Sequence, residues 1–215
     1  PSRSISKAML KKSKFPLVSL SEICDERNET YIPSSDVENQ VILYTGLANI
    51  ESNNGLAYQI PTPTASVKSA VKRYEPGDIV FARMRPNLRK VALMNFDEGG
   101  YVSPECTVLT VRKNEKGEFF IMPEVLSTIL RSDLVFGQIL HLVSGAGRPR
   151  LNVTDLRLVK VPLIPTDLQI QANLIFKSQI STVNKLREKA DAIRDESDAL
   201  ERRSINELTE RLVEN

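Results

Sequence analysis

Residues 77–94 read GDIVFARMRPNLRKVALM, and this stretch decides how the chain folds. Two apolar runs, Ile79–Ala82 and Val91–Met94, have the length and the β-branched content of strands. Between them lies a short basic segment, Arg83–Lys90, stiffened by Pro86. The pattern therefore predicts two neighbouring strands that present a basic loop.

Apolar runs of the same kind lie on both sides of this stretch. Val41–Tyr44, Thr107–Val111 and Lys160–Ile164 also have strand length, and turn residues separate them. Pro123 followed by Glu124–Leu142 has helical spacing, with the proline in the first turn. Residues 15–165 are therefore expected to form an α+β domain of irregular, mixed strands with one or two packed helices.

Residues 166–215 follow a different pattern. No glycine or proline occurs after Pro165, and Thr166-Asp167 offers an N-cap, which predicts one long helix. Apolar and small residues repeat there at heptad spacing, at Val183, Leu186, Ala190, Ile193, Ser197 and Leu200. The spacing shifts after Leu200. This helix either packs on its own domain or pairs as a coiled coil with another helix, from a second chain or a missing domain. Heptads that outlast the globule favour pairing, and a homodimer through this helix is the expected assembly.

Composition limits the possible functions. The chain has 215 residues, 41% hydrophobic and 26% charged, with a net charge of +2. Charge this balanced means that any nucleic-acid role must come from local clusters. No apolar run approaches the ~20 residues of a membrane span, and the basic N-terminus lacks the apolar core of a signal peptide. Two cysteines make no disulfide framework, so a reduced, cytoplasmic protein is expected.

Motifs of catalysis are missing. The one histidine, His141, lies in an apolar stretch and is expected to be a core residue, and with two distant cysteines it offers no zinc-ligand spacing. We find no nucleophile elbow, no phosphate-binding or dinucleotide-binding glycine pattern, and no Asn-Pro-Pro-Tyr-like tetrapeptide. The sequence predicts a binding protein, not an enzyme, with no cofactor and no metal.

Positive charge gathers in the segment 83–90, in the glycine turn 144–150 and near residue 70. Arginine forks suit phosphate oxygens and guanine, and asparagine suits adenine. The candidate DNA contacts are Arg83, Arg85, Asn87, Arg89, Lys90, Arg148, Arg150, Lys68 and Lys72. Two structural alternatives stand beside this hypothesis: a solvated hairpin with salt-bridged arginines, and a helix C-cap with surface arginines. Residues 1–14 are expected to form a basic, mobile arm that adds charge but little specificity.

Taken in order, several segments resemble the specificity subunits of type I restriction–modification systems. They are FPLVSL at 15–20, GDIVFAR at 77–83, NLRKVAL at 87–93, VSPE at 102–105, GRPRLN at 147–152, and VPLIP at 161–165 with Gln169. Each motif is modest, and their order makes the match specific. The family's usual Pro-Leu-Pro-Pro-Leu before its glutamine is replaced by Leu163-Ile164-Pro165-Thr166-Asp167-Leu168.

The resemblance implies a target-recognition domain over residues 15–165 and a spacer or dimerisation helix over residues 166–215. In that family a recognition domain reads half of a bipartite double-stranded DNA site, and the long helices dock methyltransferase (modification) subunits. A restriction subunit is a further candidate partner. Catalysis would belong to those partners, which use S-adenosylmethionine and ATP.

A full specificity subunit has two recognition domains and two spacer helices, whereas this chain has one of each. It is therefore a half-subunit that dimerises, a fragment, or the recognition domain of a larger fused adenine-specific DNA methylase. Two copies paired through antiparallel helices would read a palindrome with an unread gap. The alternative from another class is a coiled-coil scaffold whose globule binds protein.

Overall fold

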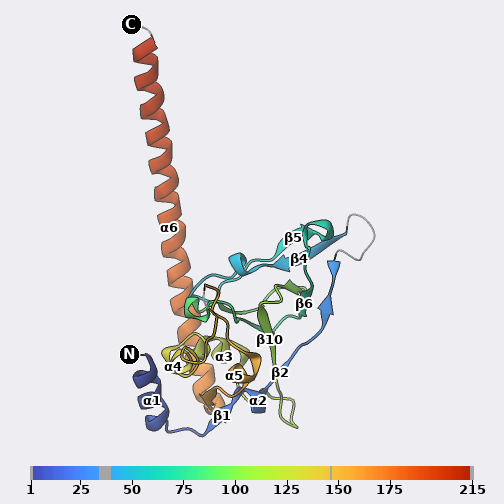
Figure 1. Cartoon of the computed structure of the whole chain (residues 1–215). Helices are drawn as coiled ribbons and strands as arrows, with labels where there is room; N and C mark the ends of the chain where they lie inside the picture. Colours follow the sequence, from blue (N-terminus) through green and yellow to red (C-terminus); the bar gives the residue numbers. More distant parts are fainter. Residues whose placement is uncertain (1, 34–39, 146, 214–215) are drawn as a thin grey trace. The chain divides into compact units, whose positions relative to one another are not determined.

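The computed structural model describes residues 2–33, 40–145 and 147–213. The chain divides into two compact units, Pro1–Gln169 and Ile170–Asn215. The first unit holds all the strands that the structure describes, and the second consists of most of the long helix α6 (Thr166–Val213). The α+β class predicted from the sequence is confirmed (Figure 1).

A four-stranded antiparallel sheet forms the centre of the first unit. Its strands, in the order in which they lie, are β2 (Cys24–Glu26), β10 (Cys106–Val111), β7 (Ile79–Ala82) and β8 (Val91–Leu93). Every residue of β7 is buried, and alternate side chains enter two different cores. Ile79 and Phe81 face one core, and Val80 faces the other, which explains why this strand is apolar throughout.

Helices cover one face of this sheet. They are α2 (Leu20–Ile23), α3 (Pro123–Ile129), α4 (Asp133–Ile139) and α5 (Val153–Arg157). Their apolar side chains, among them Leu126 and Phe136, share one core with Phe81 of β7. A small two-stranded sheet, β1 (Leu17–Ser19) with β11 (Lys160–Pro162), lies beside this layer. The predicted strand over Lys160–Ile164 therefore ends two residues early.

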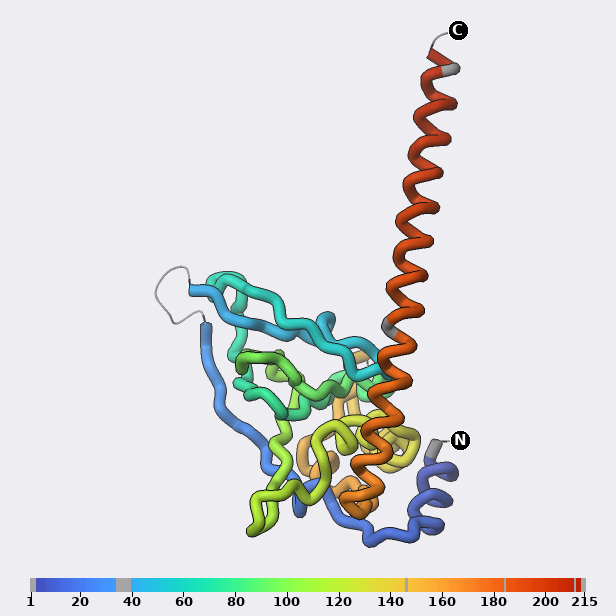
Figure 2. The backbone as a smooth tube through the Cα atoms, turned by 180° about the vertical axis from the view of Figure 1, so that it is seen from behind, coloured from blue at the N-terminus to red at the C-terminus, as the bar shows by residue number. Residues whose placement is uncertain are grey.

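A mixed five-stranded sheet covers the other face. Its strands in spatial order are β3 (Thr30–Tyr31), β6 (Val71–Tyr74), β9 (Gly100–Val102), β4 (Val41–Thr45) and β5 (Ile60–Pro63), with short 3-10 helices η2 (Leu47–Asn49) and η3 (Thr64–Ser66) nearby. Only β4 and β9 run parallel among the described strands. Tyr74 and Val102 fill the core between the two sheets. The first unit thus has three layers, and the tube in Figure 2 traces them from behind.

A carboxylate holds the turn between β6 and β7. Asp78 is 2% exposed, and it accepts hydrogen bonds from Arg27 Nε at 2.7 Å and from Thr110 Oγ1 at 2.6 Å. It also accepts one from the main-chain nitrogen of Glu75 at 2.8 Å. These bonds tie the start of β7 to β10 and to the segment that follows β2.

The structure corrects three expectations for helical segments. The helix expected over Glu124–Leu142 is two helices, because Arg131 between α3 and α4 turns inward, where Nη1 donates to Val91 O at 3.1 Å. His141 is exposed and not a core residue, since it lies in the turn after α4. The mobile arm is instead helix α1 (Ser2–Lys12), packed on α4 with the Ser6 hydroxyl donating to Leu134 O at 2.7 Å.

Gln169 ends the first unit within the first turn of α6. Its side chain is 2% exposed. Its Oε1 accepts from Met122 N at 2.6 Å, and its Nε2 donates to Ile164 O at 2.7 Å. The glutamine that carried part of the family resemblance therefore satisfies main-chain groups where the first unit ends.

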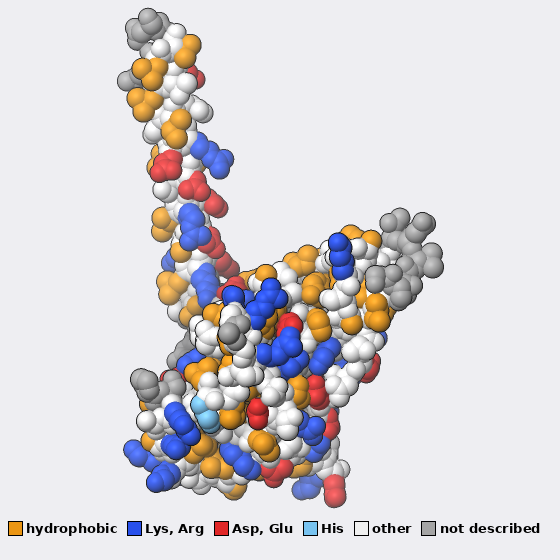
Figure 3. Space-filling view, in the orientation of Figure 1, with side chains coloured by type: hydrophobic (Ala, Val, Ile, Leu, Met, Phe, Trp, Pro, Cys, Tyr) orange, Lys and Arg blue, Asp and Glu red, His pale blue; other side chains and the backbone are white. Residues whose placement is uncertain are grey.

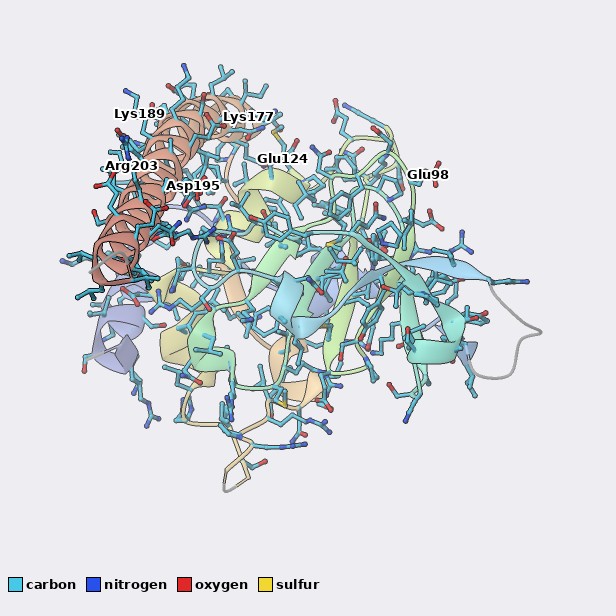
Figure 4. The ribbon with its side chains drawn as sticks, turned by 90° about the horizontal axis from the view of Figure 1, so that it is seen from above. Glu98, Glu124, Lys177, Lys189, Asp195 and Arg203 are labelled. Carbon is cyan, nitrogen blue, oxygen red and sulfur yellow. The ribbon has the colours of Figure 1, made fainter. Side chains whose placement is uncertain are left out.

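The single long helix predicted from residue 166 onward is confirmed for Thr166–Val213, which forms one helix of 48 residues (Figures 1 and 2). Charged side chains, among them Lys189, Asp195 and Arg203, stand out from it (Figure 4). Within the part of the chain that the structure describes, no helix is both long enough and apolar enough to cross a membrane.

Candidate nucleic-acid interface

The β7–β8 hairpin presents the basic loop that the sequence predicts. Phe81 pairs with Val91 across the antiparallel strands, and residues 83–90 connect them through the 3-10 helix η4 (Pro86–Leu88). Arg85 and Arg89 flank this helix in the left-handed region, with φ of 49° and 51°. Side chains other than glycine rarely adopt this conformation, and such backbone strain concentrates at functional sites.

The second arginine loop lies directly against the first. Met84 forms a β-bridge with Arg150, and Arg85 N donates to Pro149 O at 2.7 Å. Leu151 N donates to Arg83 O at 3.0 Å. Two segments more than 50 residues apart in sequence therefore form one paired unit, which we call the arginine platform: residues 83–90 and 144–150, without residue 146.

Several polar side chains of the platform are exposed to solvent. Arg85, Asn87 and Arg148 are exposed, and none of them makes an ion pair or side-chain hydrogen bond to another described residue. Arg150 is also exposed, at 49% of its side chain, and it pairs with Glu105. Lys and Arg side chains gather on the face of the first unit in Figure 3. These donors are in a position to meet an anion or a base edge.

The remaining basic residues of the hairpin hold the structure together. Arg89 donates to Arg131 O at 3.2 Å, pairs with Asp133, and stacks 4.6 Å from the centre of the Phe136 ring. Lys90 Nζ donates to Leu47 O at 2.6 Å. Their side chains are directed at other segments of the fold, so the sequence overestimated how many cations of this loop face outward.

Arg83 belongs neither to the exposed side chains of the platform nor fully to those that bond to the fold. Its Nη2 donates to Pro104 O at 3.2 Å, whereas its Nε is buried and has no hydrogen-bond partner among the described residues. Burial raises the pKa of the nearby Cys106 thiol to about 12, against the opposing electrostatic effect of Arg83, Lys72 and Lys90. Cys106 and Cys24 are both buried and unoxidised.

Neither Lys68 nor Lys72 forms a hydrogen bond or an ion pair with a described residue of the platform. Lys72 lies on β6, and its Nζ forms an ion pair with Glu26 Oε1 at 3.1 Å with both side chains largely buried. Lys68 is exposed in the loop before β6. The Lys72 side chain is therefore paired within the fold, and the Lys68 side chain is exposed to solvent.

Sequence reasoning missed Glu105 as a member of this site. It precedes β10, and its carboxylate pairs with Arg150. The only signal was its place in VSPE, one of the motifs behind the family resemblance. A search of the sequence for clusters of Lys and Arg does not reveal an acid that lies among them.

The heptad positions of α6 carry apolar side chains that are exposed. Leu186 is 61% exposed, Ile193 67% and Leu200 58%, and Val183 is 39% exposed. Ala190 and Ser197, on the interleaved positions, are exposed as well. Such a regular row of exposed large apolar residues is typical of a surface that another helix covers.

The described acidic residues, cysteines and histidine do not gather into a metal-binding group: no three or more of them are arranged to hold a metal ion. Glu22 and Asp25 have lowered carboxyl pKa values because they accept hydrogen bonds, from Ser19 and Arg112 respectively. Both are exposed carboxylates, and neither lies on the arginine platform.

Comparison with known proteins gives one clear likeness. No family model and no curated protein matches this sequence. Among solved structures, the HsdS subunit from Thermoanaerobacter tengcongensis matches with a TM-score of 0.66 and 25% identity, over 87% of this chain and 48% of that one. A structure that describes complex assembly and conformational transition of the type I R-M system matches with a TM-score of 0.62 and 25% identity, over 83% and 47%. The chain spans about half the length of each.

Proposed function

We propose that this chain reads half of a bipartite DNA site. The premise is that it has the fold of HsdS specificity subunits of type I restriction–modification systems over about half their length. The observation that carries the proposal is the arginine platform, in which two distant basic loops pair within that fold. The protein would be non-catalytic and cytoplasmic and would dock methyltransferase subunits, with a restriction subunit as a further partner. Selection of bound duplexes from a randomised pool tests the DNA-reading role.

The exposed members of the platform are the proposed DNA contacts. Arg85, Arg148 and Arg150 offer guanidinium donors that match phosphate oxygens or the two major-groove acceptors of guanine. Asn87 offers the amide that pairs with adenine. Arg83, Arg89 and Lys90 would instead hold the loop in shape, since their side chains bond to the fold.

Replacing Arg85 by alanine is expected to weaken DNA binding by about 1–3 kcal/mol, because one exposed guanidinium is lost from the interface. If Arg85 reads a base, binding to single-base variants of the site should become less selective at one position. If it holds a phosphate, affinity should fall evenly across sequences, and the salt slope should shrink by about one. Competitive binding to a set of variant duplexes separates the two.

The matched control is Lys116→Ala. Lys116 is an exposed cation in the turn between Asn114 and Glu118, which is not part of the platform. Lys116→Ala removes one positive charge, as Arg85→Ala does. The affinity of Lys116→Ala for DNA should stay within about twofold of the wild type, because physiological salt screens a charge that does not contact the DNA. If Arg85→Ala binds every duplex as the wild type does, Arg85 does not belong to the interface.

We also propose that α6 pairs with α6 of a second copy. The exposed heptad row at Val183, Leu186, Ala190, Ile193, Ser197 and Leu200 supports this pairing. In a parallel pair, a residue at heptad position g lies beside the residue five positions later, at position e, on the other helix. This arrangement would place Lys189 beside Arg194 and Glu196 beside Glu201. Like charges in both places favour the antiparallel arrangement. Two identical readers would then require a palindrome with an unread gap.

Ile193→Glu is expected to prevent this pairing, because it buries a charge at the centre of the apolar row in each of two copies. The dimer dissociation constant should rise by more than about a hundredfold, equivalent to about 2.7 kcal/mol. Sedimentation velocity over a range of protein concentrations measures it.

Ala192→Glu provides the control, since it adds the same charge one residue away, at an outer heptad position. This variant should associate as the wild type does. A wild-type chain that stays monomeric up to about 100 μM, where even weak dimers of this kind associate, would contradict pairing between two copies.

A further inference from the structure

A single carboxylate connects the two loops of the arginine platform. Glu105 Oε1 accepts a hydrogen bond from Arg150 Nη2. The main-chain oxygen of Glu105 accepts one from Arg83 N at 2.9 Å. Glu105 thus contacts the second loop through its side chain and the first through its backbone.

This position is unfavourable for a carboxylate if the platform only attracts phosphate. A negative charge there repels the DNA backbone and weakens non-specific binding. Glu105 Oε2 is also buried without a hydrogen-bond partner among the described residues, which costs desolvation free energy. Glu105 therefore reduces the general attraction for DNA, and its contribution must lie in what it does to Arg150.

The ion pair restricts the direction of the Arg150 guanidinium. Glu105 is 26% exposed and Arg150 49%, so the carboxylate is the more firmly held partner. Only Nη2 of Arg150 is bonded to it, which leaves the other guanidinium donors for a ligand. Bidentate contact with a base requires such a fixed plane, whereas a phosphate accepts a mobile cation from many directions.

We propose that Glu105 is a positioning residue for sequence discrimination: it orients Arg150 towards a base edge and withholds it from the phosphates. This inference rests on the proposed DNA-reading function and deepens it. Glu105 itself donates nothing to DNA in this account, and its effect is exerted through Arg150.

The test compares full-length wild type with Glu105→Gln, which keeps the shape and removes the charge. Dissociation constants are measured for the duplex selected by the wild type and for a scrambled duplex of the same length and composition, at several salt concentrations. We expect the discrimination ratio to fall about tenfold, the equivalent of one charge-assisted hydrogen bond. Binding of the scrambled duplex should tighten and its salt slope should steepen by about one, because Arg150 is freed for a phosphate.

Asp25→Asn is the matched control. Asp25 also pairs with an arginine, Arg112, and its loss changes the net charge by the same amount, at the edge of the central sheet formed by β2. This variant should keep the wild-type discrimination ratio. The comparison separates the position of the charge from the total charge.

Other outcomes overturn the proposal. If Glu105 is merely structural, both dissociation constants rise together, the melting temperature falls, and the ratio stays unchanged. If Glu105→Gln does not fold, Glu105→Asp keeps the charge and Arg150 but draws the carboxylate back by one methylene: loss of discrimination supports the proposal, and full discrimination refutes it. If the wild type itself shows no sequence preference, no duplex can be selected for the comparison, and the proposed DNA-reading function is wrong.

Discussion

Replacing Phe136 by alanine should lower the free energy of unfolding by about 3–5 kcal/mol, the largest effect expected of any single change here. The Phe136 ring is fully buried in the core between the helices and the central sheet. Its loss removes apolar contact area and leaves a cavity that rigid neighbours cannot close. Arg89, which stacks on this ring at 4.6 Å, would also lose its support beneath the β7–β8 loop.

Chemical denaturation followed by circular dichroism measures the effect of Phe136→Ala. Phe120→Ala is the control, because it deletes the same side chain where it is 40% exposed and should cost less than about 1 kcal/mol. A Phe136→Ala protein as stable as this control would contradict the placement of α4 against the central sheet.

Replacing Asp78 by alanine should lower the free energy of unfolding by about 3 kcal/mol or more. The carboxylate is almost completely buried and satisfies Arg27, Thr110 and the main chain of Glu75. Its removal leaves the Arg27 guanidinium, 22% exposed, without its closest partner at 2.7 Å. Removing one partner of such a pair costs more than the pair itself contributes.

Asp78→Asn should cost less than Asp78→Ala, because the amide retains the shape and one acceptor oxygen. Glu98→Ala is the control: Glu98 is an exposed acid in the loop before β9, and it points outward in Figure 4. Thermal unfolding should show an unchanged melting temperature for Glu98→Ala and a drop of at least about 6 °C for Asp78→Ala. Equal melting temperatures for all three variants would contradict the proposed role of Asp78.

Local sequence patterns predicted those parts of the fold that local energetics dominates. The strands β7 and β10 are short apolar runs because each is covered on both faces, and the sequence placed β7 at its observed bounds. The basic loop between β7 and β8 follows from two adjacent strands with few connecting residues. The long α6 follows from a segment with no glycine or proline after Pro165.

Long-range contacts account for what the sequence did not predict. The break between α3 and α4 depends on Arg131, which bonds to Val91 on a strand 40 residues earlier. Helix α1 is held by α4, far along the chain, through Ser6 and Leu134. No periodicity within either segment contains this information, because the partner is supplied by the tertiary structure.

The sequence predicted which loops form the candidate interface. Only the structure distinguishes the side chains that are exposed from those that bond to the fold. Arg85 and Arg89 are alike in sequence and in backbone conformation, yet one is exposed and the other bonds to α4. The pairing of Met84 with Arg150 joins two loops that the sequence could only treat separately. Glu105 was not predicted to belong to the interface, because it is an acid and the candidates were chosen from clusters of positive charge.

The measurement that tests the central claim most directly is selection of bound duplexes from a randomised pool, at about 150 mM salt to suppress non-specific attraction. The chain is tested alone and together with a methyltransferase subunit of a type I system. The account predicts enrichment of a palindrome with an unread gap, because two identical readers face the DNA. No enriched sequence under either condition would contradict DNA reading and favour a scaffold that binds protein.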